Sequence, residues 1–409
     1  MRVWIINYYT GVPDKSSNPR YVQFARYFMG KEWQVITFNA NHFGDERTPL
    51  FERKMYGDYD FIHVKAPCYA GNSLKRMYSI WKFAQTIYNH ANEFEKPDVI
   101  LHNVHAPFDY PIVNAAKKVG AKYVTEVWDL WPDNFVNFGL ISRYNPVMIV
   151  FYAMERWIYY HADQLVFTIP GALEYLHKKK WTTDEGGKID MTRVHYINNG
   201  VDIDQFDHDR NAYPRNDADL NRKDTVKIVY MGTINFANHV QILIDAAALL
   251  QNENNYHFFI YGDGVQREEL EKYVRERGIR NIHFKEKQIP LCEVAWVVSQ
   301  ATVNIMVYET GFGYMGVSSG KMFQYLAAGK PIVCNIDIAY DNVIRDNKLG
   351  VAENITTPED FAIAIRNCAQ LPVDKYQTMC ERVRKTGERF DYKKLCAEEI
   401  KVIEAALIS

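Results

Sequence analysis

The sequence of 409 residues has little that would place it in a membrane or outside the cell. No stretch reaches the roughly 18 to 20 uncharged apolar residues of a spanning helix, and the nearest one, residues 146–160, is interrupted by Glu155 and Arg156. The first residues lead directly into an apolar run, Val3–Ile6, without the longer segment and cleavage site of an export signal. We therefore expect a cytoplasmic protein that is not integral to a membrane.

Neither sign of charge dominates, and no cysteine pattern marks a metal site. The 48 basic and 50 acidic residues give a formal net charge of −2, so the chain lacks the basic excess that proteins use to grip nucleic acid. The six cysteines are scattered and never form the C-x2-C pairs of common zinc sites. We expect no nucleic-acid partner, no metal and no bound cofactor, and we expect the cysteines to be buried thiols of a reducing compartment.

Apolar material is abundant. A chain of 409 residues with 47% hydrophobic residues exceeds what one hydrophobic core usually organises, which predicts two domains. Aromatic residues make up 14% of the chain, with 28 Tyr and 8 Trp. This content fits sugar stacking, contact with a membrane interface and plain core packing equally well, so composition does not select between these uses.

The order of the apolar segments predicts the fold class. Short β-branched or apolar runs such as Val3–Asn7 alternate with segments of helical period, which is typical of parallel strands joined by crossover helices. The alternation restarts at Val226, after a polar, turn-rich stretch at 212–223 that we interpret as an interdomain boundary. We therefore expect an α/β protein of two tandem Rossmann-like, doubly wound parallel-sheet domains with a cleft between them, at residues 1–205 and 206–391.

In open α/β sheets, ligands bind outside the carboxyl ends of the strands, so the loops at those ends are the first candidates for function. The loop from Tyr8 to Arg20 is long for a connection of this type, for which about two to six residues are usual. We expect it to close over an acceptor or another ligand, with Gly11 and Asn18 in the loop and Arg20 as an anion contact.

The segment around residue 321 predicts a phosphate site. Ser319 and Gly320 precede a helix with an apolar face, and Lys321 lies in its first turn. A cation there opposes the helix dipole, so an anionic pyrophosphate at the same terminus would explain its presence; a solvated lysine is the alternative. Gly232 and Thr233 follow another strand, and their backbone N–H groups are a second candidate for holding phosphate.

Another glycine-rich turn, Gly262-Asp263-Gly264, carries less information. It follows a strand and opens a helix, but it has no third glycine and no acidic residue clearly placed for a dinucleotide. A tight turn between strand and helix explains this segment better than an NAD site.

Two carboxylates stand where a strand of the first half runs out into a loop. Glu126 and Asp129 could orient sugar hydroxyls or act as acid and base, with pKa values tuned by burial. In the alternative interpretation, Asp129 caps local backbone and the two neighbouring tryptophans pack in the core. His102 and His105 end another strand, but lone histidines are more often structural than catalytic.

Three motifs in this order resemble those of GT-B fold glycosyltransferases of family 4, in the branch that builds bacterial surface polysaccharides. Residues 126–132, E-V-W-D-L-W-P, resemble the E-x-R-D-L-W-P of that branch, and residues 197–202, I-N-N-G-V-D, resemble I-P-N-G-V-D. Residues 318–331 resemble S-P-x-K-x-x-E-Y-x-A-x-G-K-P. The likeness runs nearly end to end.

The resemblance implies a hexosyltransferase-type enzyme that moves a sugar from a nucleotide-diphosphate sugar to a glycan or lipid-linked acceptor, with UDP as the commonest nucleotide. It implies a retaining, metal-independent transfer, with the donor on the C-terminal domain and the acceptor on the N-terminal one. Lys321 and the loop of Gly232 would hold phosphate, and Gln324 would take the place of a glutamate that grips the ribose. A final helix, from about 392 to 409, would cross back to the first domain.

The sequence departs from that family at charged positions. The family's paired glutamates would fall at Gly316 and Gln324, an Arg and a Lys at Thr233 and Asn238, and a histidine near the reacting sugar at Trp128. Two alternatives therefore stand beside the transferase. One is a catalytically lapsed member that binds a nucleotide sugar or serves as a scaffold, and the other is a GT-B nucleotide-sugar epimerase.

A helical segment at residues 73–91 combines cations with aromatic residues, namely Lys75, Arg76, Trp81, Lys82 and Tyr88. One interpretation is a helix docked peripherally on the inner face of the membrane, close to a polyprenyl-linked acceptor. The other is an ordinary amphipathic domain helix with one solvated face.

Overall fold

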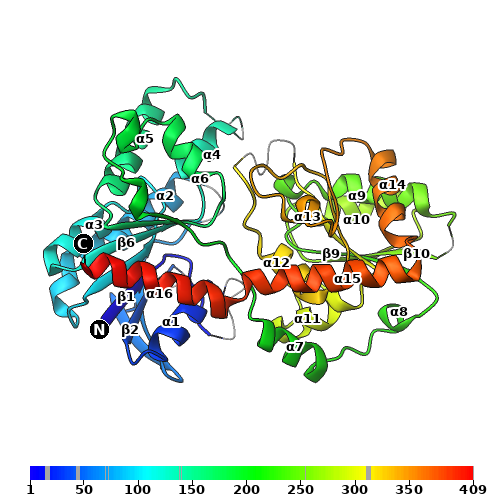
Figure 1. The fold of residues 1–409 in the computed structure, drawn as a ribbon, viewed down its shortest axis with the longest axis horizontal. Coiled ribbons are helices and arrows are strands. Elements are labelled where there is room, and N and C mark those ends of the chain that lie inside the picture. Colours follow the sequence, from blue (N-terminus) through cyan, green and yellow to red (C-terminus); the bar gives the residue numbers. More distant parts are fainter. Residues whose placement is uncertain are drawn as a thin grey trace. The chain divides into compact units, whose positions relative to one another are not determined.

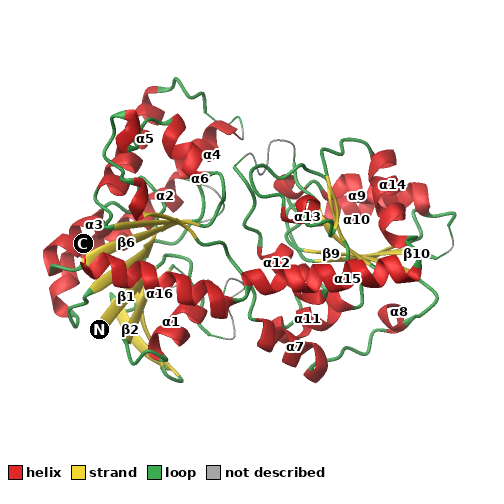
Figure 2. Cartoon of the chain, in the orientation of Figure 1, coloured by secondary structure: helices red, strands yellow, loops and turns green. Residues whose placement is uncertain are grey.

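A computed structural model describes residues 1–13, 19–42, 47–69, 71, 73–137, 139, 141–253, 255–309 and 315–408. The chain folds into two compact units. Unit 1 comprises Met1–Asn198 together with Tyr392–Ser409, and unit 2 comprises Asn199–Asp391 (Figure 1). Each unit is built on a largely parallel sheet that helices cover on both faces (Figure 2).

Unit 1 contains an eight-stranded sheet with the order β3-β4-β2-β1-β5-β6-β7-β8. Neighbouring strands are parallel except β3 and β4, which form an antiparallel hairpin at one edge. In the centre, Trp4 of β1 pairs with Ile36 of β2 and Ile100 of β5, and all three residues are buried. The strands are β1 (Arg2–Ile6), β2 (Gln34–Asn41), β3 (Phe51–Tyr56), β4 (Tyr59–Lys65), β5 (Val99–Asn103), β6 (Lys122–Val127), β7 (Gln164–Phe167) and β8 (Val194–Tyr196).

Different helices cover the two faces of this sheet. On one face, α1 (Arg20–Met29) packs with α16 (Tyr392–Ile408), and the apolar side chains of both belong to one core cluster with the strands. On the other face lie α2 (Leu74–His90), α3 (Pro111–Val119) and α5 (Pro146–Tyr160) (Figure 1). Shorter helical segments complete the unit, namely η1 (Ala91–Glu93), α4 (Trp131–Asn137), α6 (Ala172–Lys178), η2 (Thr183–Glu185) and η3 (Met191–Arg193).

Unit 2 contains a six-stranded parallel sheet with the order β11-β10-β9-β12-β13-β14. Its strands are β9 (Val226–Met231), β10 (Tyr256–Tyr261), β11 (Ile282–Phe284), β12 (Val303–Met306), β13 (Ile332–Cys334) and β14 (Gly350–Ala352). One core cluster joins this sheet to α9 (Val240–Leu250), α10 (Arg267–Glu276) and α14 (Pro358–Ala369). A second cluster joins it to α7 (Ile203–Ala212), α11 (Leu291–Ser299), α12 (Gly320–Ala328), α13 (Val343–Asp346) and α15 (Val373–Gly387). The predicted fold class of two tandem doubly wound α/β domains is confirmed.

The unit boundary differs from the predicted one. Unit 2 begins at Asn199, whereas the sequence placed the boundary after residue 205. The polar stretch 212–223 is not a boundary, because it lies inside unit 2 and contains the short helix α8 (Ala218–Asn221). Asp217 caps this helix and pairs with Lys285 across 3.1 Å. The polar residues of this stretch therefore hold neighbouring segments of one unit together.

The helix that the sequence predicts from about residue 392 is α16, which begins at Tyr392 and belongs to unit 1. It follows α15 and the short helix η5 (Glu388–Phe390) of unit 2. Unit 2 also contains the short helix η4 (Phe236–Asn238), between β9 and α9. Where the chain leaves unit 2 it pairs with the segment that enters it, because the Val201 N–H donates to the Phe390 carbonyl at 3.0 Å.

Within the described ranges, no helix combines the length and apolar character needed to cross a bilayer. All six cysteines are free thiols. Cys334, Cys368 and Cys396 are buried as expected. Cys68 is exposed, so the prediction that all cysteines are buried is wrong for this residue.

Candidate functional site

The N-terminus of α12 in unit 2 has no side-chain cap. Ser319 occupies the N-cap position with φ −98° and ψ 125°, but its side chain does not cap the helix, and the first turn has no acidic residue. Among the described residues, nothing lies within 4 Å of a Cβ atom built on Gly320. Backbone N–H groups and the positive end of the helix dipole are therefore available to an anion.

Lys321, in the first turn of α12, turns toward the loop that follows β9. Its Nζ atom donates to the Asn238 side chain at 3.1 Å and lies 5.0 Å from the ring centres of Tyr230 and Tyr308. A Cβ atom added to Gly232 would lie 3.2 Å from the same Nζ atom. Burial lowers the pKa of Lys321 to about 8, because aromatic rings replace much of the water around its ammonium group. This weakly hydrated cation suits an anionic ligand.

The other residues predicted to bind the donor belong to the same unit. Thr233 is exposed beside Gly232, and its carbonyl accepts a 2.7 Å hydrogen bond from the Tyr230 hydroxyl, which fixes the loop. Gln324 is half-buried and follows Lys321 by three residues on α12. Gly232 and Lys321 therefore lie close together in the structure. That Gln324 binds the ribose of a ligand stays a prediction.

Gly262 and Gly264 explain how the loop after β9 reaches Lys321. Their φ angles are +128° and +153°. A Cβ atom on Gly262 would lie 1.9 Å from the Gly232 carbonyl oxygen, and one on Gly264 would lie 2.2 Å from the Ile234 carbonyl oxygen. The tight turn predicted from the sequence is therefore only one reason for these glycines. The other is that only glycine at these two positions leaves room for the loop after β9 to pack against the turn.

Replacing Gly262 by alanine is expected to displace the Gly232 loop and to weaken binding of a diphosphate ligand about tenfold or more, as measured by calorimetry. The matched control is Gly278→Ala, which also introduces a side chain at positive φ (+63°) but has no described atom within 4 Å. That control is expected to lower the melting temperature and leave the affinity unchanged. Equal affinities for the two variants would show that the loop does not depend on the absence of a side chain at Gly262.

Four side chains gather at the carboxyl end of the unit 1 sheet, and we call them the Tyr9 cluster: Tyr9, Arg76, His105 and Trp131. The His105 ring lies 5.2 Å from the ring of Tyr9 and 5.7 Å from that of Trp131. Arg76 donates to the Tyr9 hydroxyl at 2.7 Å, and its guanidinium lies 5.1 Å from the Trp131 ring centre. Aromatic faces beside a cation are a common surface for sugar rings and their anionic substituents.

The sequence points to this cluster only in part. His105 stands there as a lone histidine, Trp131 belongs to the motif at residues 126–132, and Arg76 suggests only membrane contact. Tyr9 lies in the loop from Tyr8 to Arg20, which the sequence already marks as functional because loops at that edge carry function in this fold class.

Asp109 holds His102 and His105 together. The His102 Nε2 atom lies 3.2 Å and the His105 Nδ1 atom 3.3 Å from Asp109 Oδ2. Burial alone would raise the pKa of Asp109, but the two histidines hold it below its usual range. His102 is buried and also contacts the Tyr123 hydroxyl at 2.7 Å, so its role is structural. In the described part of the chain, no three His, Cys, Asp or Glu side chains are arranged as metal ligands.

Asp129 lies two residues after the end of β6, close to the Tyr9 cluster. It keeps exposed surface, while loss of water around the carboxylate raises its pKa against the opposing influence of His105 and Arg76. The charges of these two neighbours place Asp129 beside the cluster. It is therefore the carboxylate of the predicted pair that can meet a ligand.

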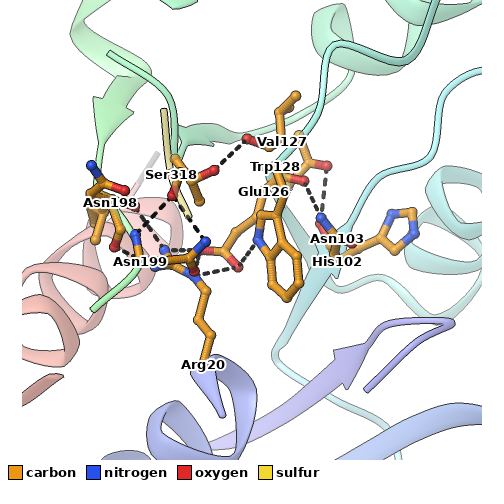
Figure 3. Close-up of polar contacts among 12 residues, drawn as sticks. Arg20, His102, Asn103, Glu126, Val127, Trp128, Asn198, Asn199 and Ser318 are labelled. Atoms are coloured by element: carbon orange, nitrogen blue, oxygen red, sulfur yellow. Dashed lines mark hydrogen bonds and ion pairs between the residues drawn. The ribbon is translucent and has the colours of Figure 1, made fainter. Parts of the chain in front are cut away.

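Glu126, the other predicted catalytic carboxylate, is fully buried in an ion pair with Arg20 (Figure 3). The Arg20 Nε atom donates to Glu126 at 3.0 Å, and its Nη atoms donate to the carbonyls of Asn198 at 2.6 Å and Ile197 at 3.1 Å. The Trp128 indole donates to the same carboxylate at 3.2 Å. Both predictions are corrected: Glu126 does not face a ligand, and Arg20 is not an anion contact, because burial and these partners occupy their polar atoms.

A second acid stands near this ion pair. Glu399 of α16 is fully buried, and among the described residues neither of its carboxylate oxygens has a hydrogen-bond partner. Burial raises the pKa of Glu399 well above its usual value, and the charge of Glu126 adds to the effect while Arg20 opposes it. The protonated form is therefore favoured, since a second buried carboxylate beside one arginine would be uncompensated.

The predicted closing loop is seen only at its ends. Gly11 follows β1 and is half-buried, and Arg20 is the first residue of α1. Asn18 lies outside the described residues. Closure of this loop over a ligand stays a prediction for Gly11 and Asn18.

Two doubly wound units in tandem, each with candidate binding groups at the carboxyl ends of its strands, define the GT-B class of fold. A solved structure described as trehalose-6-phosphate from E. coli bound with UDP-2-fluoro glucose is similar, with a TM-score of 0.74 and 10% identity over 98% of this chain and 99% of that one. Residues 225–370 match the family model described as Glycosyl transferases group 1, so unit 2 carries a glycosyltransferase group 1 domain.

Two curated relatives extend this finding. The chain is 24% identical over 275 residues to the probable glycosyltransferase WbjE of Pseudomonas aeruginosa, covering 65% of this chain and 64% of that protein. It is 29% identical over 222 residues to the putative colanic acid biosynthesis glycosyl transferase WcaI of Escherichia coli (strain K12), covering 52% of each. The match thus spans about two thirds of one relative and about half of the other. The predicted GT-B fold and the resemblance to bacterial glycosyltransferases are confirmed.

Proposed function

We propose that this protein transfers a sugar from a nucleoside-diphosphate sugar to a glycan or polyprenyl-linked acceptor in the biosynthesis of a bacterial surface polysaccharide. In this proposal unit 2 binds the donor and unit 1 binds the acceptor, and the transfer retains the anomeric configuration without a metal. The observation that carries the proposal is the weakly hydrated Lys321 ammonium at the uncapped N-terminus of α12, 3.2 Å from a Cβ position on Gly232. The group 1 domain at residues 225–370 supports it.

The chemistry of the donor fits these groups. When the bond to the sugar breaks, negative charge develops on the diphosphate that leaves. Backbone N–H groups at Gly320 and Lys321, the helix dipole and the Lys321 ammonium would stabilise this charge without reorganising. Gln324 would donate to or accept from the ribose hydroxyls. Uridine is the nucleotide we propose, since a structurally similar protein is described with UDP-2-fluoro glucose bound.

The acceptor is assigned to the Tyr9 cluster. Tyr9 is exposed and Trp131 is half-buried, so their rings would offer apolar surface to a sugar beside the Arg76 guanidinium, which would offer a charged donor to an acidic substituent or a phosphate. Asp129 would accept a hydrogen bond from the acceptor hydroxyl and so orient it. This role needs a carboxylate with exposed surface, which Asp129 has and Glu126 lacks.

The proposal is tested by the thermal shift of the purified chain against uridine, guanosine, adenosine and thymidine diphosphates and their sugars, with and without magnesium. A rise in melting temperature with uridine diphosphate that does not need magnesium is the expected result, because ligands that bind only the folded state stabilise it. Hydrolysis or transfer from the sugar donor, followed by chromatography, then separates a transferase from a chain that only binds. No shift with any nucleotide would reject the donor assignment.

A further inference from the structure

The short helix η4, between β9 and α9, is fixed at three points. The Asn235 side chain accepts hydrogen bonds from the Ala237 N–H at 3.1 Å and from the Asn238 side chain at 2.9 Å. Asn238 in turn accepts the hydrogen bond of the Lys321 ammonium at 3.1 Å. The Ala237 carbonyl accepts a hydrogen bond from the Glu309 N–H at 2.9 Å. This turn therefore joins the candidate diphosphate site to the segment that follows β12.

The residue after η4, His239, has a backbone conformation that side chains rarely adopt. Its φ angle is 29° and its ψ angle is 46°, which is strained for a residue other than glycine. His239 occupies the N-cap position of α9, but its side chain does not cap that helix. A capping hydrogen bond therefore does not explain the strain, and residues held in such conformations are concentrated at functional sites.

Glu309 brings a carboxylate to the same place. Its Oε2 atom lies 3.8 Å from His239 Nδ1, and the His239 side chain is 36% exposed and that of Glu309 50% exposed. The two residues follow β9 and β12, which are neighbours at the position where the order of the strands reverses direction. Ligands of doubly wound sheets bind at such a switch point, so both side chains stand where a ligand is expected.

The charges around this turn are unevenly distributed. Residues 233–238 contain no charged side chain. Lys321 contacts the turn at Asn238, and its ammonium is assigned to the diphosphate. The turn supplies no second cation, so a group attached to the diphosphate would meet the His239 imidazole and the Glu309 carboxylate at this edge of unit 2.

We propose that His239 and Glu309 bind the hydroxyl groups of the sugar that the donor carries. A carboxylate accepts hydrogen bonds from hydroxyls, and an imidazole accepts or donates one. The same carboxylate repels a sugar that has a carboxylate of its own. The inference rests on the proposed function and names the class of donor. This donor is a nucleoside-diphosphate sugar with a neutral sugar, such as a hexose or an N-acetylhexosamine, and its sugar is not a uronic acid.

Two other roles fit these side chains less well. A phosphate bound by His239 would also lie beside the Glu309 carboxylate, 3.8 Å from the ring nitrogen, and the two negative charges would repel each other. An exposed ion pair between the two side chains contributes little to stability and does not account for the strained backbone at His239. Sugar hydroxyls are neutral and suit both side chains.

The test compares UDP-glucose with UDP-glucuronic acid, and UDP-galactose with UDP-galacturonic acid, by isothermal titration calorimetry. The two donors of each pair differ only in the oxidation of carbon 6 to a carboxylate. The unaltered chain is expected to bind the neutral donor about tenfold or more tightly than the acid. Glu309→Gln is expected to bring this ratio close to one, because it removes the charge and keeps the shape of the side chain.

A second variant tests the imidazole. His239→Asn keeps a residue type that tolerates positive φ, so the backbone of the turn should be retained. It is expected to weaken the neutral donor that binds best about tenfold, while the affinity for UDP and the melting temperature change little. A loss of affinity that is equal for UDP and for the sugar donor would show that His239 does not contact the sugar.

The matched control is Glu276→Gln, which neutralises an exposed acid at the end of α10 and is expected to leave every ratio unchanged. If UDP binds but the unaltered chain does not distinguish neutral from acidic donors, or if Glu309→Gln leaves the ratio unchanged, this inference is overturned and the proposed donor site stands. Absence of binding by UDP and by all four donors would reject the proposed function, and this inference with it.

Discussion

Replacing Lys321 by alanine is expected to weaken the binding of uridine diphosphate about 100-fold, as measured by isothermal titration calorimetry. A charge-assisted hydrogen bond to phosphate contributes about 1.5–3 kcal/mol, and about 1.4 kcal/mol corresponds to a factor of ten. The fold should tolerate the change. The folded-state pKa of Lys321, about 8, lies below that of an unfolded lysine, so the charged form destabilises the fold below pH 8 and its removal should not lower the melting temperature at pH 7.

The pH dependence gives a second measurement on the same residue. Without ligand, the Lys321 amine loses its proton as the pH rises through about 8, so the affinity of the unaltered chain should fall above that pH. Lys321→Arg keeps its charge and should bind with an affinity that changes little over this range. Lys272→Ala removes an exposed cation on α10 of the same unit and serves as the control. An undiminished affinity in Lys321→Ala would mean that the diphosphate binds elsewhere.

The second large effect is on stability. Replacing Arg20 by alanine is expected to lower the free energy of unfolding by about 3–5 kcal/mol, because it leaves the fully buried Glu126 carboxylate without its counter-ion. It also removes the donors to the carbonyls of Ile197 and Asn198. Denaturant unfolding followed by tryptophan fluorescence measures the change, and Trp128 reports on the site directly because its indole contacts Glu126.

A double variant separates charge from packing at this site. Arg20→Met/Glu126→Gln removes both charges and should be more stable than Arg20→Ala, since the large cost comes from one uncompensated charge. Lys31→Ala, just after the same helix, changes an exposed cation and should have little effect. A loss below about 1 kcal/mol for Arg20→Ala would contradict the buried ion pair and would reopen a catalytic role for Glu126.

Much of the fold could be predicted from the sequence because it depends on local patterns. The apolar run Val3–Ile6 and its successors repeat at the spacing of strands and crossover helices, and this spacing allows few topologies. The domain boundary could not be placed in the same way. Val201 and Phe390 pair through their backbones, which leaves no mark in composition, whereas the polar stretch at 212–223 has the composition of a boundary and packs inside unit 2.

The candidate site likewise contains residues that local patterns predict and residues that only the three-dimensional packing brings together. Gly232 and Lys321 could be predicted together because Gly232 follows the carboxyl end of β9 and Lys321 lies in the first turn of the helix that comes after β12 of the same sheet, where ligands of this fold class bind. The pairing of Arg20 with Glu126 joins residues 106 positions apart and could not be anticipated from either neighbourhood. The contact between Arg76 and Tyr9 could not be predicted from the sequence either, because it depends on how α2 packs on the sheet.

The place of α16 in unit 1 affects how this chain can fold while it is being translated. Its side chains Leu395, Ile400 and Ile403 belong to the core that covers α1 and the first sheet, although they are encoded after the whole of unit 2. While the ribosome translates the middle of the message, that apolar surface is therefore uncovered. The first sheet can gain this cover only after α16 has left the exit tunnel, so we expect a nascent chain stalled before that point to bind chaperones that recognise exposed apolar surface.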